Sequence, residues 1–227
     1  MSYIQITNRC NMKCKHCCFS CTSIGHDMTM FVYEKALEYC QERGDETIAI
    51  GGGEPTIHPM FDEMLMKALY KFDYVWMATN GKDKEKTLDL ISFASKCDNF
   101  TLAISQDNFH SPIDLEVWEK VEYVNKHFDN KIEIRNVNKL LNHGRAKNLD
   151  SFYYEKNEDC CCPDLFINHY GEVKWCGCDE AKIITNVTYP REHIVECDLI
   201  NLYGECFKTS EEYKEFCKNE SSFKLCK

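Results

Sequence analysis

The sequence lacks a long hydrophobic run, since no stretch of its 227 residues approaches the roughly 20 apolar residues that span a bilayer. Its first residues, Met1 to Ile4, carry neither the cationic segment nor the apolar core of a signal peptide. Positive charge is also scarce, because 27 Lys and Arg stand against 37 Asp and Glu, a net charge of −10. We therefore expect a cytoplasmic protein that has neither a membrane nor nucleic acid as a partner.

Cysteine, by contrast, is abundant, with 16 residues in the chain. Scaffolds held together by disulfides are small and secreted, and neither condition is met here. A chain of this length can bury a hydrophobic core without such cross-links. The composition therefore indicates a reduced, oxygen-sensitive protein that uses thiolates to hold metal.

Three cysteines, Cys10, Cys14 and Cys17, have the spacing C-x3-C-x2-C directly after a short apolar run. A structural zinc site usually takes four protein ligands, whereas an iron–sulfur cluster in an enzyme can leave one iron open. Three clustered ligands therefore suggest an incomplete, reactive site. The alternatives are buried structural thiols, or a zinc knuckle or disulfide set that also includes Cys18 and Cys21.

A glycine-rich motif, Gly-Gly-Gly-Glu-Pro at residues 51–55, follows the β-rich residues 47–50. Residues without a Cβ atom let the backbone approach a ligand closely, and Glu54 can face a ligand ammonium group. With both motifs in view, the chain resembles the radical S-adenosylmethionine superfamily. The resemblance implies that the three cysteines bind a [4Fe-4S] cluster, whose fourth iron is chelated by S-adenosylmethionine. It also implies reductive cleavage of that cofactor to a 5′-deoxyadenosyl radical.

Short β-rich runs at residues 3–7, 47–50, 74–78, 100–104 and 131–137 alternate with amphipathic helical patterns. This alternation predicts β/α units around a parallel sheet. The resemblance implies a partial (β/α)6 barrel whose core covers residues 1–145. Residues 146–227 are expected to add the last barrel elements and a small cysteine-rich extension that contains a β-hairpin.

Polar signatures follow the expected strands, at the carboxyl ends where ligands bind in such sheets. By the resemblance, His16 lies against adenine, Asp107 accepts ribose hydroxyls, and Arg135 pairs with the methionyl carboxylate. An exposed loop histidine, an Asn80-Gly81 turn and a surface salt bridge of Arg135 are the alternatives. The expected contacts to the cofactor are His16, Gly52, Gly53, Glu54, Asn80, Ser105, Asp107 and Arg135.

A second group of cysteines flanks β-rich residues around Gly171 that read as a hairpin. Nine residues separate Cys161 from Gly171 and four separate Gly171 from Cys176, which resembles the opening of SPASM and twitch extensions. The resemblance implies an auxiliary iron–sulfur cluster, with zinc or scattered structural thiols as alternatives. The later cysteines are too widely spread for a second auxiliary cluster. The candidate ligands are Cys160, Cys161, Cys162, Cys176 and Cys178.

The function expected from these features is abstraction of a hydrogen atom from a substrate, leading to a crosslink or a dehydrogenation in a peptide. A small-molecule substrate, activation of a glycyl radical enzyme, and a non-catalytic metal-binding module are the alternatives. A flavodoxin or ferredoxin is the expected electron donor. Because the first expected strand begins at Tyr3, no room is left for an N-terminal leader-binding domain, so a separate peptide-recognition protein is a further candidate partner.

Overall fold

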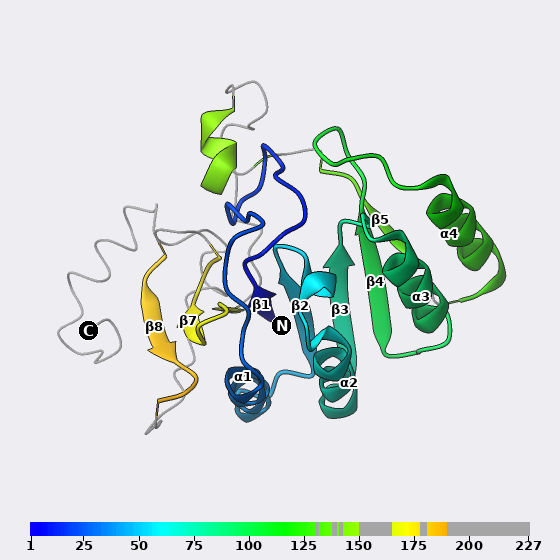
Figure 1. Cartoon of the computed structure of the whole chain (residues 1–227). Coiled ribbons are helices and arrows are strands. Elements are labelled where there is room, and N and C mark those ends of the chain that lie inside the picture. The colour runs from blue at the N-terminus through cyan, green and yellow to red at the C-terminus, as the bar shows by residue number, and fades with distance from the viewer. Residues whose placement is uncertain (130–131, 138–139, 141–142, 150–164, 178–180, 190–227) are drawn as a thin grey trace.

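The computed structural model describes residues 1–129, 132–137, 140, 143–149, 165–177 and 181–189. Eight strands in this part form one sheet in the order β5-β4-β3-β2-β1-β6-β7-β8 (Figure 1). The strands are β1 (Ser2–Thr7), β2 (Thr47–Gly52), β3 (Tyr74–Thr79), β4 (Phe100–Ser105), β5 (Glu133–Arg135), β6 (Leu165–Ile167), β7 (Glu172–Lys174) and β8 (Ile183–Asn186). The helices are α1 (Met30–Glu42), α2 (Phe61–Lys71), α3 (Lys84–Ala94) and α4 (Leu115–His127), with 3-10 turns η1 (Pro55–Ile57) and η2 (Gly144–Asn148).

The strands β1 to β5 are parallel neighbours in chain order, and a helix connects each of the first four strands to the next. Because such crossovers are right-handed, α1 to α4 lie along the same side of the sheet (Figure 1). The sheet is open, and within the described residues no strand pairs with the outer edge of β5. The predicted α/β fold with parallel strands is therefore confirmed as an open, partial barrel.

The helices α1, α3 and α4 begin at residues whose side chains accept hydrogen bonds from the first turn. Thr29 accepts from Val32 N at the start of α1, and Asp83 accepts from Lys86 N at the start of α3. Such caps satisfy amide groups that have no partner inside the helix. In the described part of the chain, none of the helices combines the length and the apolar character needed to cross a bilayer.

The core lies between the sheet and the helices. In β1, alternate side chains point into this core or to the opposite face of the sheet. Ile4 and Ile6 are fully buried in the apolar cluster that contains Leu37 of α1. Since successive side chains of a strand point to opposite faces, Tyr3 points away from this helical layer. Tyr3 instead lines the cavity described below.

The hairpin expected around Gly171 is confirmed, and it extends the same sheet. β6 pairs in parallel with β1, placing Ser2 opposite Leu165, while β6 and β7 are antiparallel. Gly171 has a φ of 79°, which glycine adopts without steric cost at the turn. The side-chain oxygen of Asn168 accepts hydrogen bonds from the amides of residues 170 and 172 and closes the same turn. The hairpin is thus continuous with the sheet through β1.

Candidate functional site

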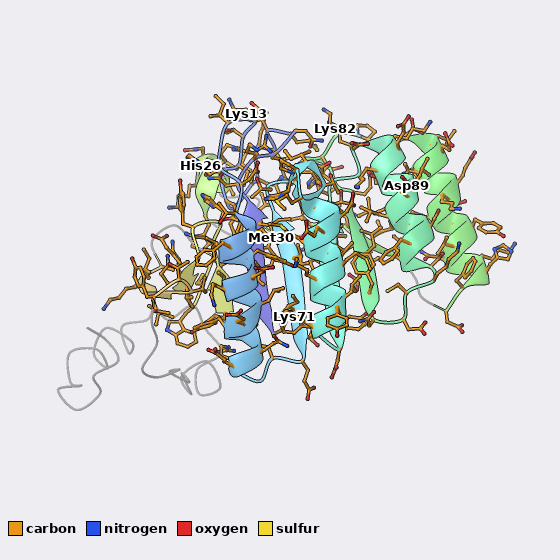
Figure 2. All side chains as sticks on the ribbon, turned by 60° about the horizontal axis from the view of Figure 1, so that its bottom comes forward. Lys13, His26, Met30, Lys71, Lys82 and Asp89 are labelled. Carbon is orange, nitrogen blue, oxygen red and sulfur yellow. The ribbon has the colours of Figure 1, made fainter. Side chains whose placement is uncertain are left out.

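The three clustered cysteines lie in the loop of residues 8–29 between β1 and α1, here called the cysteine loop. An ion pair between Arg9 Nη2 and Asp27 Oδ2, 2.6 Å apart, joins the two ends of this loop. Cys10 N also donates to Thr22 O at 2.6 Å, so a second contact crosses the loop. These contacts hold the loop closed at the carboxyl end of β1. In Figure 2, Lys13 of this loop lies at the same end of the molecule as Lys82, and Lys71 lies near the opposite end.

The thiols of Cys10, Cys14 and Cys17 line one cavity of about 270 Å³, here called the central cavity. Burial raises the pKa of the Cys10 thiol to about 11 and also raises the pKa of Cys14. A hydrogen bond from Cys21 lowers the pKa of Cys17. Buried thiolates are stable beside a metal cation, which removes their protons outright. Three soft sulfur donors on one wall therefore fit an iron–sulfur cluster with three protein ligands.

The glycine-rich motif packs directly against the cysteine loop. Gly53 N donates to Thr7 O at 2.8 Å, and Glu54 N donates to Arg9 O at 2.9 Å. A Cβ atom at Gly52 would lie 2.4 Å from Thr7 O, and one at Gly53 would lie 2.1 Å from Arg9 O. Glycine is therefore needed at both positions for packing as well as for the close approach of a ligand, because the Cα atoms face another segment of the chain. Both also line the central cavity.

Glu54 is buried, and its carboxylate joins the glycine-rich motif to the end of β3. Oε1 accepts hydrogen bonds from Thr56 Oγ1 at 2.7 Å and Thr79 Oγ1 at 2.8 Å, and Oε2 accepts from Asn80 N at 2.7 Å. Burial raises the pKa of this carboxyl group. A carboxylate on the cavity wall, held by neutral donors, fits a ligand ammonium group, because a cation there offsets the cost of burying the charge.

The sequence left two alternatives for Asn80, a turn residue or a residue of the cofactor site. In the structure Asn80 both forms a turn and lines the cavity. Its Oδ1 accepts from Lys82 N at 2.9 Å, and Gly81 follows with a φ of 67°, as in a turn. Its Nδ2 donates to Asn11 Oδ1 at 2.8 Å and approaches Cys10 Sγ at 3.7 Å. Asn80 therefore supports the cysteine loop from the end of β3.

Ser105 and Arg135 end adjacent strands, are register partners in the β4–β5 pair, and both line the central cavity. The Arg135 guanidinium lies over the Trp76 ring, 5.2 Å from its centroid. In the described part of the chain no carboxylate pairs with Arg135. A guanidinium on a cavity wall can bind a ligand carboxylate.

Asp107 lies behind the cavity wall, between two histidines that line it. Its Oδ1 accepts hydrogen bonds from Phe109 N at 2.8 Å and His110 N at 3.1 Å, and it lies 2.8 Å from His110 Nδ1. Its Oδ2 lies 3.9 Å from His16 Nε2. Asp107 is not among the residues that line the cavity, whereas His16 and His110 are. One buried carboxylate thus orients the His110 imidazole and lies beside that of His16.

The three side chains also bring one ligand atom each to within 4.8 Å of one another, as a metal site would require. Asp107 Oδ1, however, already faces three N–H groups, and the short contact to His110 Nδ1 is accounted for by a hydrogen bond. Metal binding through these two atoms would break that bond. The contacts of Asp107 Oδ1 therefore describe a hydrogen-bonded cluster.

The structure brings most of the expected site residues to this one cavity. Cys10, Cys14, Cys17, His16, Gly52, Gly53, Glu54, Asn80, Ser105 and Arg135 all line it. The sequence reasoning did not select Tyr3, Met12, Cys18, Phe19, Ala78, Thr79, His110, Val137, Leu140 and Arg145, which line it too. The alternation of the first strand could have indicated Tyr3, and the Gly-Arg-Ala sequence at residues 144–146 could have indicated Arg145.

The second cysteine group is described at Cys176 alone, since Cys160, Cys161, Cys162 and Cys178 lie outside the described residues. Cys176 is buried, with 6% of its surface exposed. A Cβ atom at the adjacent Gly177 would lie 2.8 Å from the Phe19 ring. The segment that holds Cys176 therefore packs against the cysteine loop.

Comparison with known proteins shows which family the chain resembles. The family model of the radical SAM superfamily matches residues 4–145. The chain is 25% identical over 232 residues to YydG of Bacillus subtilis, a protein named for peptide biosynthesis, covering 84% of this chain and 72% of YydG.

Two solved structures resemble the chain at low sequence identity, which shows a shared fold. BtrN in complex with AdoMet and 2-DOIA has a TM-score of 0.61 at 15% identity, covering 96% of this chain and 85% of BtrN. Streptococcus suis SuiB bound to the precursor peptide SuiA has a TM-score of 0.51 at 20% identity, covering 62% of this chain and 33% of SuiB.

Proposed function

Because the chain belongs to the radical S-adenosylmethionine superfamily, a family of enzymes, we propose that it cleaves S-adenosylmethionine and abstracts a hydrogen atom from a peptide. The observation that carries this proposal is the central cavity. Its wall combines three cysteines with an acidic and a basic side chain, Glu54 and Arg135. When bound there, a [4Fe-4S] cluster supplies the electron that cleaves the cofactor to a 5′-deoxyadenosyl radical.

The cysteines would hold that cluster, and other side chains of the wall would hold the cofactor. Glu54 presents a buried carboxylate that favours an ammonium group, and Arg135 presents a guanidinium that favours a carboxylate. The methionyl end of S-adenosylmethionine carries both an ammonium group and a carboxylate. The imidazole of His16 on the cavity wall, tilted by 74° from that of His110, would lie against the adenine. Together these residues would fix the cofactor and exclude water from the reacting atoms.

The proposal of a peptide substrate is supported by the relatives. YydG is named for peptide biosynthesis, and SuiB was solved with a precursor peptide. The chain spans 33% of SuiB, so the activity of that whole protein is not carried over here. An external electron donor such as flavodoxin or ferredoxin, and a separate peptide-recognition protein, belong to the same proposal.

The proposed product is oxidised by two electrons, as in a crosslink or a dehydrogenation. One hydrogen atom leaves the peptide with the 5′-deoxyadenosyl radical, which becomes 5′-deoxyadenosine. An auxiliary cluster, which the second cysteine group would hold, would accept the remaining electron, and a proton would be lost. The burial of Cys176 beside the cysteine loop supports an acceptor at this position.

The test is anaerobic reconstitution followed by incubation with dithionite, S-adenosylmethionine and short peptides encoded next to this gene. We expect 5′-deoxyadenosine, together with a peptide that has lost two hydrogen atoms in its mass spectrum. If protein with a loaded cluster forms no 5′-deoxyadenosine, the proposed chemistry is wrong. If it forms 5′-deoxyadenosine and changes only added small molecules, the proposed peptide substrate is wrong.

A further inference from the structure

The 3-10 turn η2 is hydrogen-bonded to the cysteine loop across more than a hundred residues of sequence. Arg145 Nε donates to Cys14 O at 2.9 Å, and Arg145 Nη1 donates to Cys21 O at 2.7 Å. The backbone amide of Arg145 donates to Cys17 O at 3.0 Å. One residue therefore binds the loop at three carbonyl groups, all of them belonging to cysteines.

The preceding glycine is what lets η2 approach this closely. Gly144 has a φ of 55°, and a Cβ atom there would lie 2.3 Å from Cys18 O and 2.5 Å from Cys17 O. A larger residue would push η2 away from the loop and lengthen the hydrogen bonds of Arg145. The Gly-Arg pair thus acts as one structural unit.

Arg145 also lines the central cavity, together with Cys10, Cys14 and Cys17. Its planar fork reaches two carbonyl groups from a single position, which the ammonium of lysine cannot reproduce. Arginine stays protonated in proteins, so this positive charge is permanent. The side chain therefore brings both a rigid link and a fixed charge to the place where three thiolates would gather.

We propose that Arg145 is a positioning residue that holds residues 14–21 in the shape that presents the three cysteines, and that its charge favours the reduced state of a cluster bound there. The inference rests on the proposed function for its second half only. Reduction adds negative charge to the site, and a nearby cation stabilises that charge. The link to the loop exists in the protein without any cluster.

Three variants separate the link from the charge. Arg145→Gln removes both, Arg145→Lys keeps the charge and loses the two-pronged link, and Lys147→Gln removes an exposed charge from the same turn as a matched control. Hydrogen exchange of residues 14–21, measured by mass spectrometry in cluster-free protein, reports the link. The midpoint potential, measured by anaerobic EPR titration of reconstituted protein, reports the charge.

We expect residues 14–21 to exchange roughly tenfold faster in Arg145→Gln and Arg145→Lys, as the loss of a charge-assisted hydrogen bond implies, and to be unchanged in Lys147→Gln. The potential should become more negative in Arg145→Gln and stay near that of the parent in Arg145→Lys. Unchanged exchange in both Arg145 variants would overturn the positioning role. An unchanged potential in Arg145→Gln would overturn the role of the charge.

Two checks keep these results interpretable. If Arg145→Gln does not fold, as judged by circular dichroism, Arg145→Lys alone tests the positioning role through exchange, and a second uncharged variant, Arg145→Met, tests the role of the charge through its potential. Failure of the proposed function would appear differently, as a parent protein that forms no 5′-deoxyadenosine while the exchange of its cluster-free form still depends on Arg145.

Discussion

Cys40 and Cys10 are both buried, yet they lie in two regions of the molecule that use cysteine differently. Cys40 is fully buried in the apolar layer between α1 and the sheet, where burial raises its pKa to about 12. Cys10 lines the central cavity, close to the amide of Asn80. The comparison teaches that the position relative to the carboxyl ends of the strands, rather than the residue type or its burial, separates a cavity residue from a core residue.

The largest expected effect comes from removing the cavity cysteines. The triple variant Cys10→Ala, Cys14→Ala and Cys17→Ala should form no 5′-deoxyadenosine, because it lacks every proposed ligand of the catalytic cluster. Its iron content should fall from about eight to about four per chain if the second cysteine group holds its own [4Fe-4S] cluster. Iron and sulfide analysis after anaerobic reconstitution measures this change. A triple variant that binds no iron would show that the auxiliary cluster does not exist.

The next effect concerns the contact between the glycine-rich motif and the cysteine loop. Gly53→Ala should destabilise the fold by roughly 3 kcal/mol and reduce iron loading, since the new methyl group meets Arg9 O at 2.1 Å. Gly44→Ala is the control, because its Cβ atom meets nothing within 4 Å and only the φ of 79° opposes it, at about 1 kcal/mol. Urea unfolding and iron analysis measure both. Equal iron loading in the two variants would contradict this account of Gly53.

A smaller effect is expected at Arg135, the cation on the cavity wall. Arg135→Gln should weaken S-adenosylmethionine binding by roughly tenfold, the loss expected for one charge-assisted pair, while the cluster still loads. Arg135→Lys should recover part of this affinity, because it keeps the charge but loses the planar fork. Isothermal titration of the reconstituted protein measures the affinities. Full affinity in Arg135→Gln would assign the carboxylate to another residue.

The smallest effect is expected on the helical side of the sheet. Cys40→Ala should cost about 1 kcal/mol of unfolding free energy, because it leaves a small cavity in the core. Iron content and 5′-deoxyadenosine formation should match those of the parent protein, since Cys40 lies outside the central cavity. A drop in iron content in this variant would contradict the claim that core cysteines such as Cys40 differ from the cavity cysteines in metal binding.

Local patterns in the sequence predicted much of the fold. The helical spacing of Tyr33, Leu37 and Cys40 matches α1, and the turn residues around Gly171 match the β6–β7 hairpin. The strand-end positions of Glu54, Asn80, Ser105 and Arg135 indicated a shared site, and all four line the central cavity. These inferences succeeded because periodicity and turn chemistry act over a few residues, and because parallel strands place their carboxyl ends at one edge.

Contacts between distant segments could not be read in the same way. Asp107 Oδ2 lies 3.9 Å from Nε2 of His16 in the cysteine loop, a contact that depends on the path of the loop after β4. Only glycine fits at positions 52 and 53, because a Cβ atom there would clash with the backbone oxygens of Thr7 and Arg9 in the neighbouring segment. Neither contact has a signal in local spacing.

The sequence by itself determined the family, the β/α order and the residues available for the site, because each of these is written in short motifs and periodic patterns. The tertiary structure alone decided that Tyr3 faces the cavity, that the hairpin joins the sheet at β1, and that Arg145 binds the cysteine loop. The physical reason is that strand register and loop packing bring together groups more than a hundred residues apart, and such contacts depend on the whole fold.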